Sequence, residues 1–173
     1  MSDLWPCIYT RISHDLSGLA GSIFNGTELL VDEPTTDMAL MLQKATGQLV
    51  ARLKFFRQTF GQQNKLDEDT TAAYLETLSV PVRLEGVCSC ALERVLCMAL
   101  ADTLPRGGCI RVQKGKLTAE GQTIKLLPCL EKGTDEESPQ TAAALYAYEL
   151  AKQQQIRLVV EKTETSVCVR LNP

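Results

Sequence analysis

The segment Arg11-Ile12-Ser13-His14-Asp15-Leu16-Ser17-Gly18-Leu19 holds the only histidine among the 173 residues of the chain. It begins a longer stretch in which apolar or small residues recur at alternating steps of four and three, a spacing typical of a helix packed against other helices. This apolar stripe comprises Ile12, Leu16, Leu19, Ile23, Gly26 and Leu30, and Trp5 and Tyr9 are expected to extend it backwards. His14 lies midway between Ile12 and Leu16 in sequence, which places it on the side of the helix opposite the stripe. We therefore expect its ring to face solvent. A lone histidine is commonly an ordinary surface or core residue, but an exposed imidazole beside the carboxylate of Asp15 can also serve chemistry.

Two helices joined by a short connection are predicted for the first third of the chain. The first spans about residues 3–31 and ends at Asp32-Glu33-Pro34-Thr35-Thr36, because proline disfavours helix at the residue before it. Either threonine can cap the second helix, expected over about residues 37–60, and Gly61 ends it. So short a connection makes the two helices antiparallel neighbours.

A hairpin of this kind cannot enclose its own core, because each helix shows its stripe to only one neighbour. Either a second copy of the chain docks to complete a four-helix bundle, or the remainder of the chain folds back over the stripe. The apolar spacing alone leaves both possibilities open.

The rest of the chain is predicted to form a second, mixed domain. Residues 62–67 are polar and read as a linker, which places the boundary near residue 65 and divides the chain into domains 1–65 and 66–173. Helices are expected over residues 69–78, 91–104 and 138–152, and strands over 80–84, 109–114, 122–127, 156–161 and 167–171. Pro81 indicates an edge strand. This order predicts the α+β fold class, with helices on one face of a mostly antiparallel sheet.

Composition excludes several classes of function. A net charge of -3 gives no reason to expect a nucleic-acid partner, and no apolar run approaches the ~20 residues of a membrane helix. The N-terminus lacks the basic and apolar regions of a secretory signal, so seven scattered cysteines indicate reduced thiols in the cytoplasm. Cys88, Cys90 and Cys97 lie close in sequence, but no second ligand pair completes a zinc pattern, and core packing is the expected role.

Three stretches carry a resemblance to a known family. Taken in order, these stretches resemble parts of the ChpT-like histidine phosphotransferases. The first is His14-Asp15-Leu16 followed by Asn25-Gly26-Thr27-Glu28-Leu29-Leu30, the second is Leu53-Lys54-Phe55-Phe56-Arg57-Gln58-Thr59-Phe60-Gly61, and the third is Ala101-Asp102-Thr103-Leu104-Pro105-Arg106-Gly107-Gly108. The resemblance implies a dimeric four-helix bundle followed by an α/β sandwich like a degenerate ATP-binding domain of histidine kinases. It also implies a cytoplasmic phosphorelay protein that passes phosphoryl groups between receiver-domain aspartates of a hybrid kinase and of response regulators.

By this resemblance, His14 is the residue that carries the phosphoryl group, and Asp15 orients its ring. Arg11, Gly18 and Ser22 are candidate partner contacts by their position on the first helix, although a solvated helix face with little energetic weight is the plain alternative for Arg11 and Asp15. Asn25 is expected to cap or brace the bundle, and Arg57 suits the negative end of the second helix dipole. No bound cofactor is expected, because the receiver domain would supply Mg²⁺.

Two departures from related kinases shape the expected activity. The chain has no Asp-x-Gly-x-Gly turn or glycine-rich lid, and Cys97 stands where kinases carry a magnesium-holding asparagine, so ATP binding is not expected. Four residues after the histidine, Gly18 replaces the Thr, Asn or Ser common in relatives, which predicts weak phosphatase activity. Two alternatives stay open, a scaffold that binds response regulators without catalysis and a diverged ATP-dependent kinase.

Overall fold

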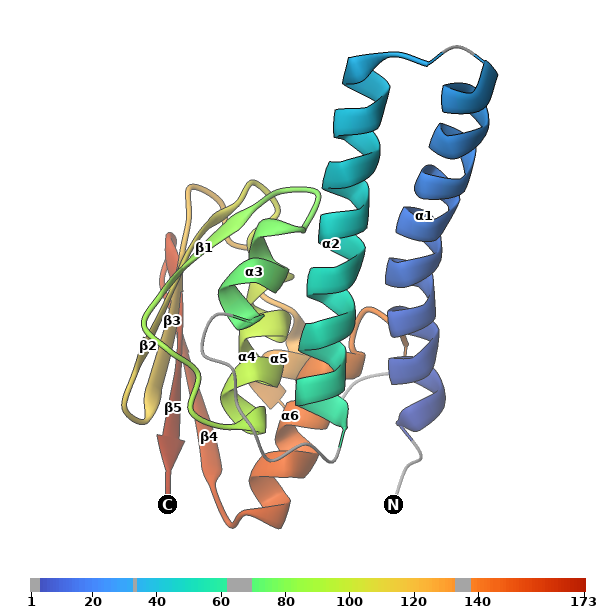
Figure 1. Ribbon diagram of the computed structural model, residues 1–173. Helices are drawn as coiled ribbons and strands as arrows, with labels where there is room; N and C mark the ends of the chain where they lie inside the picture. The colour runs from blue at the N-terminus through green and yellow to red at the C-terminus, as the bar shows by residue number, and fades with distance from the viewer. Residues whose placement is uncertain (1–3, 33, 62–69, 133–137) are drawn as a thin grey trace.

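A long antiparallel helical hairpin forms the first part of the computed structural model, which describes residues 4–32, 34–61, 70–132 and 138–173 (Figure 1). Helix α1 spans Trp5–Asp32 and helix α2 spans Thr36–Phe60, each within two residues of the predicted bounds. Thr35 is the capping threonine, since its side chain accepts a hydrogen bond from the Met38 N–H. Gly61 ends α2, and its N–H donates to the Arg57 carbonyl.

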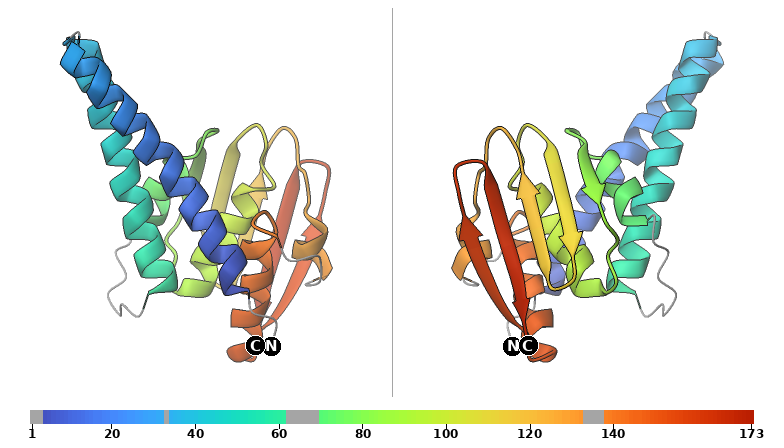
Figure 2. Two further views of the ribbon diagram at one scale, coloured as in Figure 1. Left: turned by 90° about the vertical axis from the view of Figure 1, so that its right-hand side faces the viewer. Right: turned by 90° about the vertical axis from the view of Figure 1, so that its left-hand side faces the viewer.

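The second part is a five-stranded mixed sheet with helices α3, α4 and α6 over one face (Figure 2). Its elements are α3 (Thr70–Glu76), β1 (Val82–Glu85), α4 (Ala91–Ala101), β2 (Gly108–Gln113), β3 (Lys116–Glu120), α5 (Pro128–Lys132), α6 (Ala142–Gln153), β4 (Arg157–Lys162) and β5 (Ser166–Asn172). The strand order is β1-β2-β3-β5-β4, in which β1 runs parallel to β2 and the other pairs are antiparallel. The predicted α+β class and the edge position of the strand after Pro81 are confirmed.

The predicted strand over residues 122–127 is wrong. A two-residue turn follows β2, because Gln113 pairs with Lys116 and Gly115 takes a φ of 71°, a conformation glycine adopts without a steric penalty. The next strand is therefore β3, whose alternate residues Leu117 and Ala119 are buried against the helices. The predicted strand thus lies too late in the chain, at 122–127 in place of Lys116–Glu120.

Two helices differ from the prediction, and the predicted domain boundary lies outside the described residues. Helix α6 begins at Ala142, because Ser138 and Thr141 bond to each other in a separate turn before it. The short helix α5 was not predicted. The domain boundary near residue 65 falls among residues that the structure does not describe.

The base of the hairpin packs onto the second part of the same chain. Phe55 stacks on Tyr74 of α3, with ring centroids 3.9 Å apart and an interplanar angle of 7°, and both rings are buried. Ile8 is also buried, whereas Trp5 and Tyr9 are 51% and 72% exposed. Tyr9 therefore does not extend the apolar stripe as predicted, whereas Ile8, one turn before Ile12, does so. The half-exposed Trp5 ring packs against Tyr146 of α6, with ring centroids 5.7 Å apart.

The cysteine cluster is part of the core in this fold. Cys88 and Cys97 are buried, and their Sγ atoms lie 3.5 Å apart. Among the described residues, no group of three or more His, Cys, Asp or Glu side chains is arranged to hold a metal ion. No helix within the described ranges is long and apolar enough to span a membrane.

Replacing Tyr74 with Ala should lower the free energy of unfolding by about 3 kcal/mol or more, because it removes a buried ring and leaves a cavity between α3 and the hairpin. Urea unfolding followed by circular dichroism measures the loss. Tyr9→Ala is the matched control, and its effect should stay within about 0.5 kcal/mol since Tyr9 is exposed. Equal losses in the two variants would contradict the observed packing.

Candidate functional site

His14 stands on the solvent side of α1. Its side chain is 89% exposed, while Ile12 and Leu16 on the opposite side of the helix are half-buried. The apolar stripe thus fixes the rotation of α1, and this rotation turns the imidazole outward as predicted.

A cavity of about 430 Å³ lies beside His14, between α1 and the second part of the chain. Thr10, Arg11, His14 and Asp15 form the wall on α1. The facing wall consists of Asp102, Lys125, Leu127, Pro139 and Gln140. A group attached to the ring of His14 would therefore sit next to side chains of both parts of the molecule.

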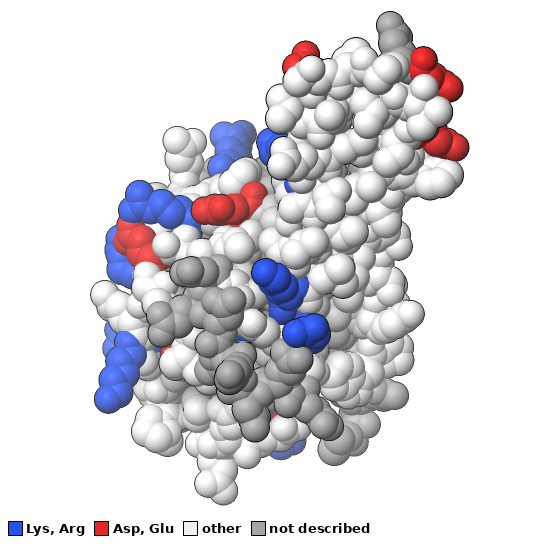
Figure 3. All heavy atoms as spheres, viewed as in Figure 1, with Lys and Arg blue, Asp and Glu red and all other residues white. Residues whose placement is uncertain are grey.

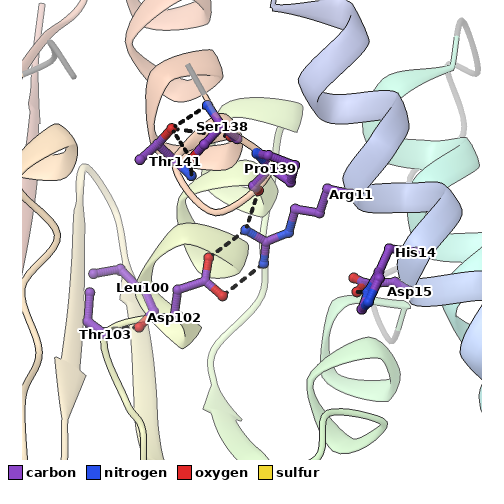
Figure 4. A network of polar contacts seen from close by, with 9 residues as sticks. All are labelled: Arg11, His14, Asp15, Leu100, Asp102, Thr103, Ser138, Pro139 and Thr141. Carbon is purple, nitrogen blue, oxygen red and sulfur yellow. Dashed lines mark hydrogen bonds and ion pairs between the residues drawn. The ribbon is translucent and has the colours of Figure 1, made fainter. Parts of the chain in front are cut away.

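Arg11 is held by a bidentate ion pair with Asp102, just after α4 (Figure 4). The two Arg11 nitrogens lie 2.7 and 2.8 Å from the two Asp102 oxygens, and one of them also donates to the Pro139 carbonyl at 3.5 Å. The Arg11 and Asp102 side chains are only 13% and 29% exposed. Burial by itself would lower the pKa of Arg11, but the hydrogen bonds and charge of Asp102 raise this pKa overall, so the guanidinium stays charged.

Asp15 lies beside His14 but does not bond to its ring here. The His14 Nδ1 and Asp15 Oδ1 atoms are 3.8 Å apart, beyond hydrogen-bond distance, and the Asp15 side chain is 23% exposed. The negative charge of Asp15 also helps to raise the pKa of Arg11 by electrostatic attraction. For Asp15 to orient the ring, as the resemblance implies, the His14 Nδ1 and Asp15 Oδ1 atoms would have to come closer.

Arg52 of α2 attaches α1 to α3 next to this site. It donates to the Asp15 carbonyl at 3.0 Å, to the Thr77 hydroxyl at 3.0 Å and to the Thr77 carbonyl at 2.6 Å. Sequence reasoning assigned no role to Arg52, Asp102 or Lys125. Asp102 lies within one of the three stretches that resemble the ChpT-like family, whereas no pattern in the sequence singles out Arg52 or Lys125.

The other predicted site residues occupy two different regions. Gly18 and Ser22 follow His14 by one and two turns on an exposed part of α1, where the Ser22 hydroxyl donates to the Gly18 carbonyl at 2.9 Å. A Cβ atom added at Gly18 would meet nothing within 4 Å, so this surface is open. Asn25 and Arg57 are exposed, and neither lines the cavity beside His14.

Two comparisons with known proteins agree with this arrangement. Residues 93–166 match the family model described as the histidine phosphotransferase C-terminal domain. No curated protein matches the chain. Among solved structures, the fold is similar to "1.7 Angstrom Structure of a Bacterial Phosphotransferase", with a TM-score of 0.81 and 20% sequence identity. The similarity covers 98% of this chain and 96% of the other.

The family match lies within the expected second domain, and the structural match includes the hairpin that carries His14. The resemblance to ChpT-like histidine phosphotransferases is therefore confirmed, with residues 93–166 matching the histidine phosphotransferase C-terminal domain family and the fold of nearly the whole chain matching a bacterial phosphotransferase.

Proposed function

We propose that the protein relays phosphoryl groups between receiver-domain aspartates through phospho-His14. The observation that carries this proposal is the position of the single histidine, 89% exposed on the hairpin and at the edge of a cavity between the two parts of the chain. The family of residues 93–166 supports a role in phosphotransfer.

The chemistry requires little of the protein beyond a positioned nucleophile. A ring nitrogen of neutral His14 attacks the phosphorus of an aspartyl phosphate, so a P–N bond forms while the P–O bond to the aspartate breaks and releases its carboxylate. The reverse step passes the phosphoryl group to a second aspartate. Mg²⁺ held by the receiver would offset the charge on the phosphoryl oxygens, and a rotated Asp15 side chain would orient the ring.

Replacing His14 with Ala should abolish transfer of labelled phosphate from a phosphorylated receiver, because the chain has no other histidine. Lys162→Ala, at an exposed position of β4, is the control and should transfer like the wild type. Gel autoradiography of the labelled mixture measures both. Acid-labile label on the His14→Ala protein would contradict the proposal.

The same variant separates the relay from a scaffold, and incubation with labelled ATP separates it from a kinase. A non-catalytic scaffold would bind and block response regulators equally well with or without the His14 ring. A diverged kinase would become labelled from ATP alone, and we expect no such labelling because the chain lacks the phosphate-binding glycine motifs.

Gly18 is expected to keep phosphatase activity low, since it offers no side chain to hold a hydrolytic water. The Gly18→Thr variant tests this expectation, since a Cβ atom added there would meet nothing within 4 Å. This variant should release inorganic phosphate from a phosphorylated receiver faster than the wild type, in a colorimetric phosphate assay. Rapid release by the wild type that survives the loss of His14 would overturn this expectation.

We also propose that the upper half of the hairpin pairs with a second copy to complete a four-helix bundle. Large apolar side chains remain exposed there, among them Phe24 at 61%, Leu29 at 56% and Met41 at 72%. Figure 3 shows few charged side chains on the visible face of this projecting half, apart from acidic groups near its tip. Exposed apolar surface of this kind is typical of an association site.

Met41→Glu should dissociate this dimer, because it places a charge within the apolar contact. Light scattering after size exclusion measures the molar mass at micromolar concentration. Val87→Glu, at a 47% exposed position on the second part of the chain, is the control and should stay dimeric. A monomeric wild type would contradict the proposed bundle.

A further inference from the structure

We propose that the Arg11–Asp102 ion pair is a positioning device that sets the orientation of the His14 helix relative to the C-terminal part of the chain. This inference rests on the proposed relay function and assigns Arg11 a role other than the partner contact expected from sequence. Arg11 and Asp102 are positioning residues, because neither has to touch the phosphoryl group.

The geometry favours an internal role for Arg11. A guanidinium and a carboxylate that meet through two parallel bonds fix both distance and angle, which a single contact would not do. The bonds of 2.7 and 2.8 Å join residues 91 positions apart, and the third contact, to the Pro139 carbonyl, adds the segment before α6. With a side chain only 13% exposed, Arg11 presents little of its charge to an incoming protein.

A second arginine anchors the other side of the same turn of α1. Arg52 bonds the Asp15 carbonyl and both oxygens of Thr77, at the end of α3. Arg11 lies three residues before His14 and Asp15 directly follows it. His14 therefore stands between two points at which α1 is fastened to the rest of the molecule, while the ring itself stays free.

Orientation matters because of what lies opposite the histidine. The cavity places Lys125, Leu127 and Gln140 across from His14, so a protein that reaches the ring also meets this wall. The phosphoryl donor must approach the ring nitrogen in line, and displacement of reacting atoms by about 1 Å costs up to ~100-fold in rate. A receiver matches both surfaces at the least cost in binding energy where their relative orientation is fixed beforehand, because otherwise part of the binding energy goes into restoring it.

The test is the dependence of the initial transfer rate on the concentration of phosphorylated receiver. Arg11→Ala and Asp102→Asn should each raise KM by about 10-fold, equivalent to about 1.4 kcal/mol, because the competent orientation is less populated. The kcat should change by less than about threefold, since a bound receiver restores the orientation. The exchanged pair, Arg11→Asp with Asp102→Arg, should recover most of the wild-type KM.

The Asp102→Asn variant decides between positioning and direct contact. It keeps the Arg11 guanidinium and nearly the same side-chain shape, so it should fold even if the exchanged pair does not. If Asp102→Asn transfers like the wild type while Arg11→Ala is impaired, Arg11 contacts the partner directly and the positioning role is overturned. Wild-type kinetics in both single variants would also overturn it.

Two controls separate this inference from other failures. Arg106→Ala removes an exposed arginine close to Asp102 in sequence and should leave KM unchanged. Partial unfolding would lower the apparent kcat without a change in KM, and the urea midpoint of each variant checks it. If the Arg11 and Asp102 variants keep the wild-type KM while transfer still requires His14, only this inference is rejected. Transfer without His14 would reject the proposed function.

Discussion

Two amphipathic helices cannot enclose a core by themselves, and this constraint organises the whole molecule. The chain meets it in two ways along the length of one hairpin. At the base, Ile8, Phe55 and Phe56 are buried against the second part of the same chain. Further up, the hairpin projects beyond the sheet and its helices with Phe24 and Met41 exposed (Figures 1 and 2).

The position of His14 follows from this division. The imidazole is exposed on α1 and yet borders a cavity whose two walls come from α1 and from the C-terminal part. The apolar stripe fixes the rotation of the helix, and the ion pair between Arg11 and Asp102 connects the same turn to the sheet-bearing part. Exposure of the ring and rigidity of the helix beneath it thus have separate causes.

Periodicity and capping residues sufficed to predict both hairpin helices to within two residues, and the outward direction of His14, because these depend on local sequence. The strand predicted at 122–127 is wrong because the two-residue turn at Gly115 makes β3 begin directly at Lys116, and Gly121 follows the end of that strand. Asp102 and Arg52 could not be found as partners of α1, since their contacts span 91 and 37 positions and no local pattern encodes them. The site residues expected on α1 are thus joined by others that only the tertiary fold brings near.

The central claim is that a covalent phosphoryl group resides on His14 during the reaction. Phosphorus NMR and intact-protein mass spectrometry of the chain after incubation with a phosphorylated receiver address it directly. The account predicts one added phosphoryl group per chain, with the resonance of a phosphoramidate, located on His14 and lost in acid. A phosphoryl group on a carboxylate or hydroxyl, or receiver dephosphorylation without any phosphorylated form of this protein, would contradict it.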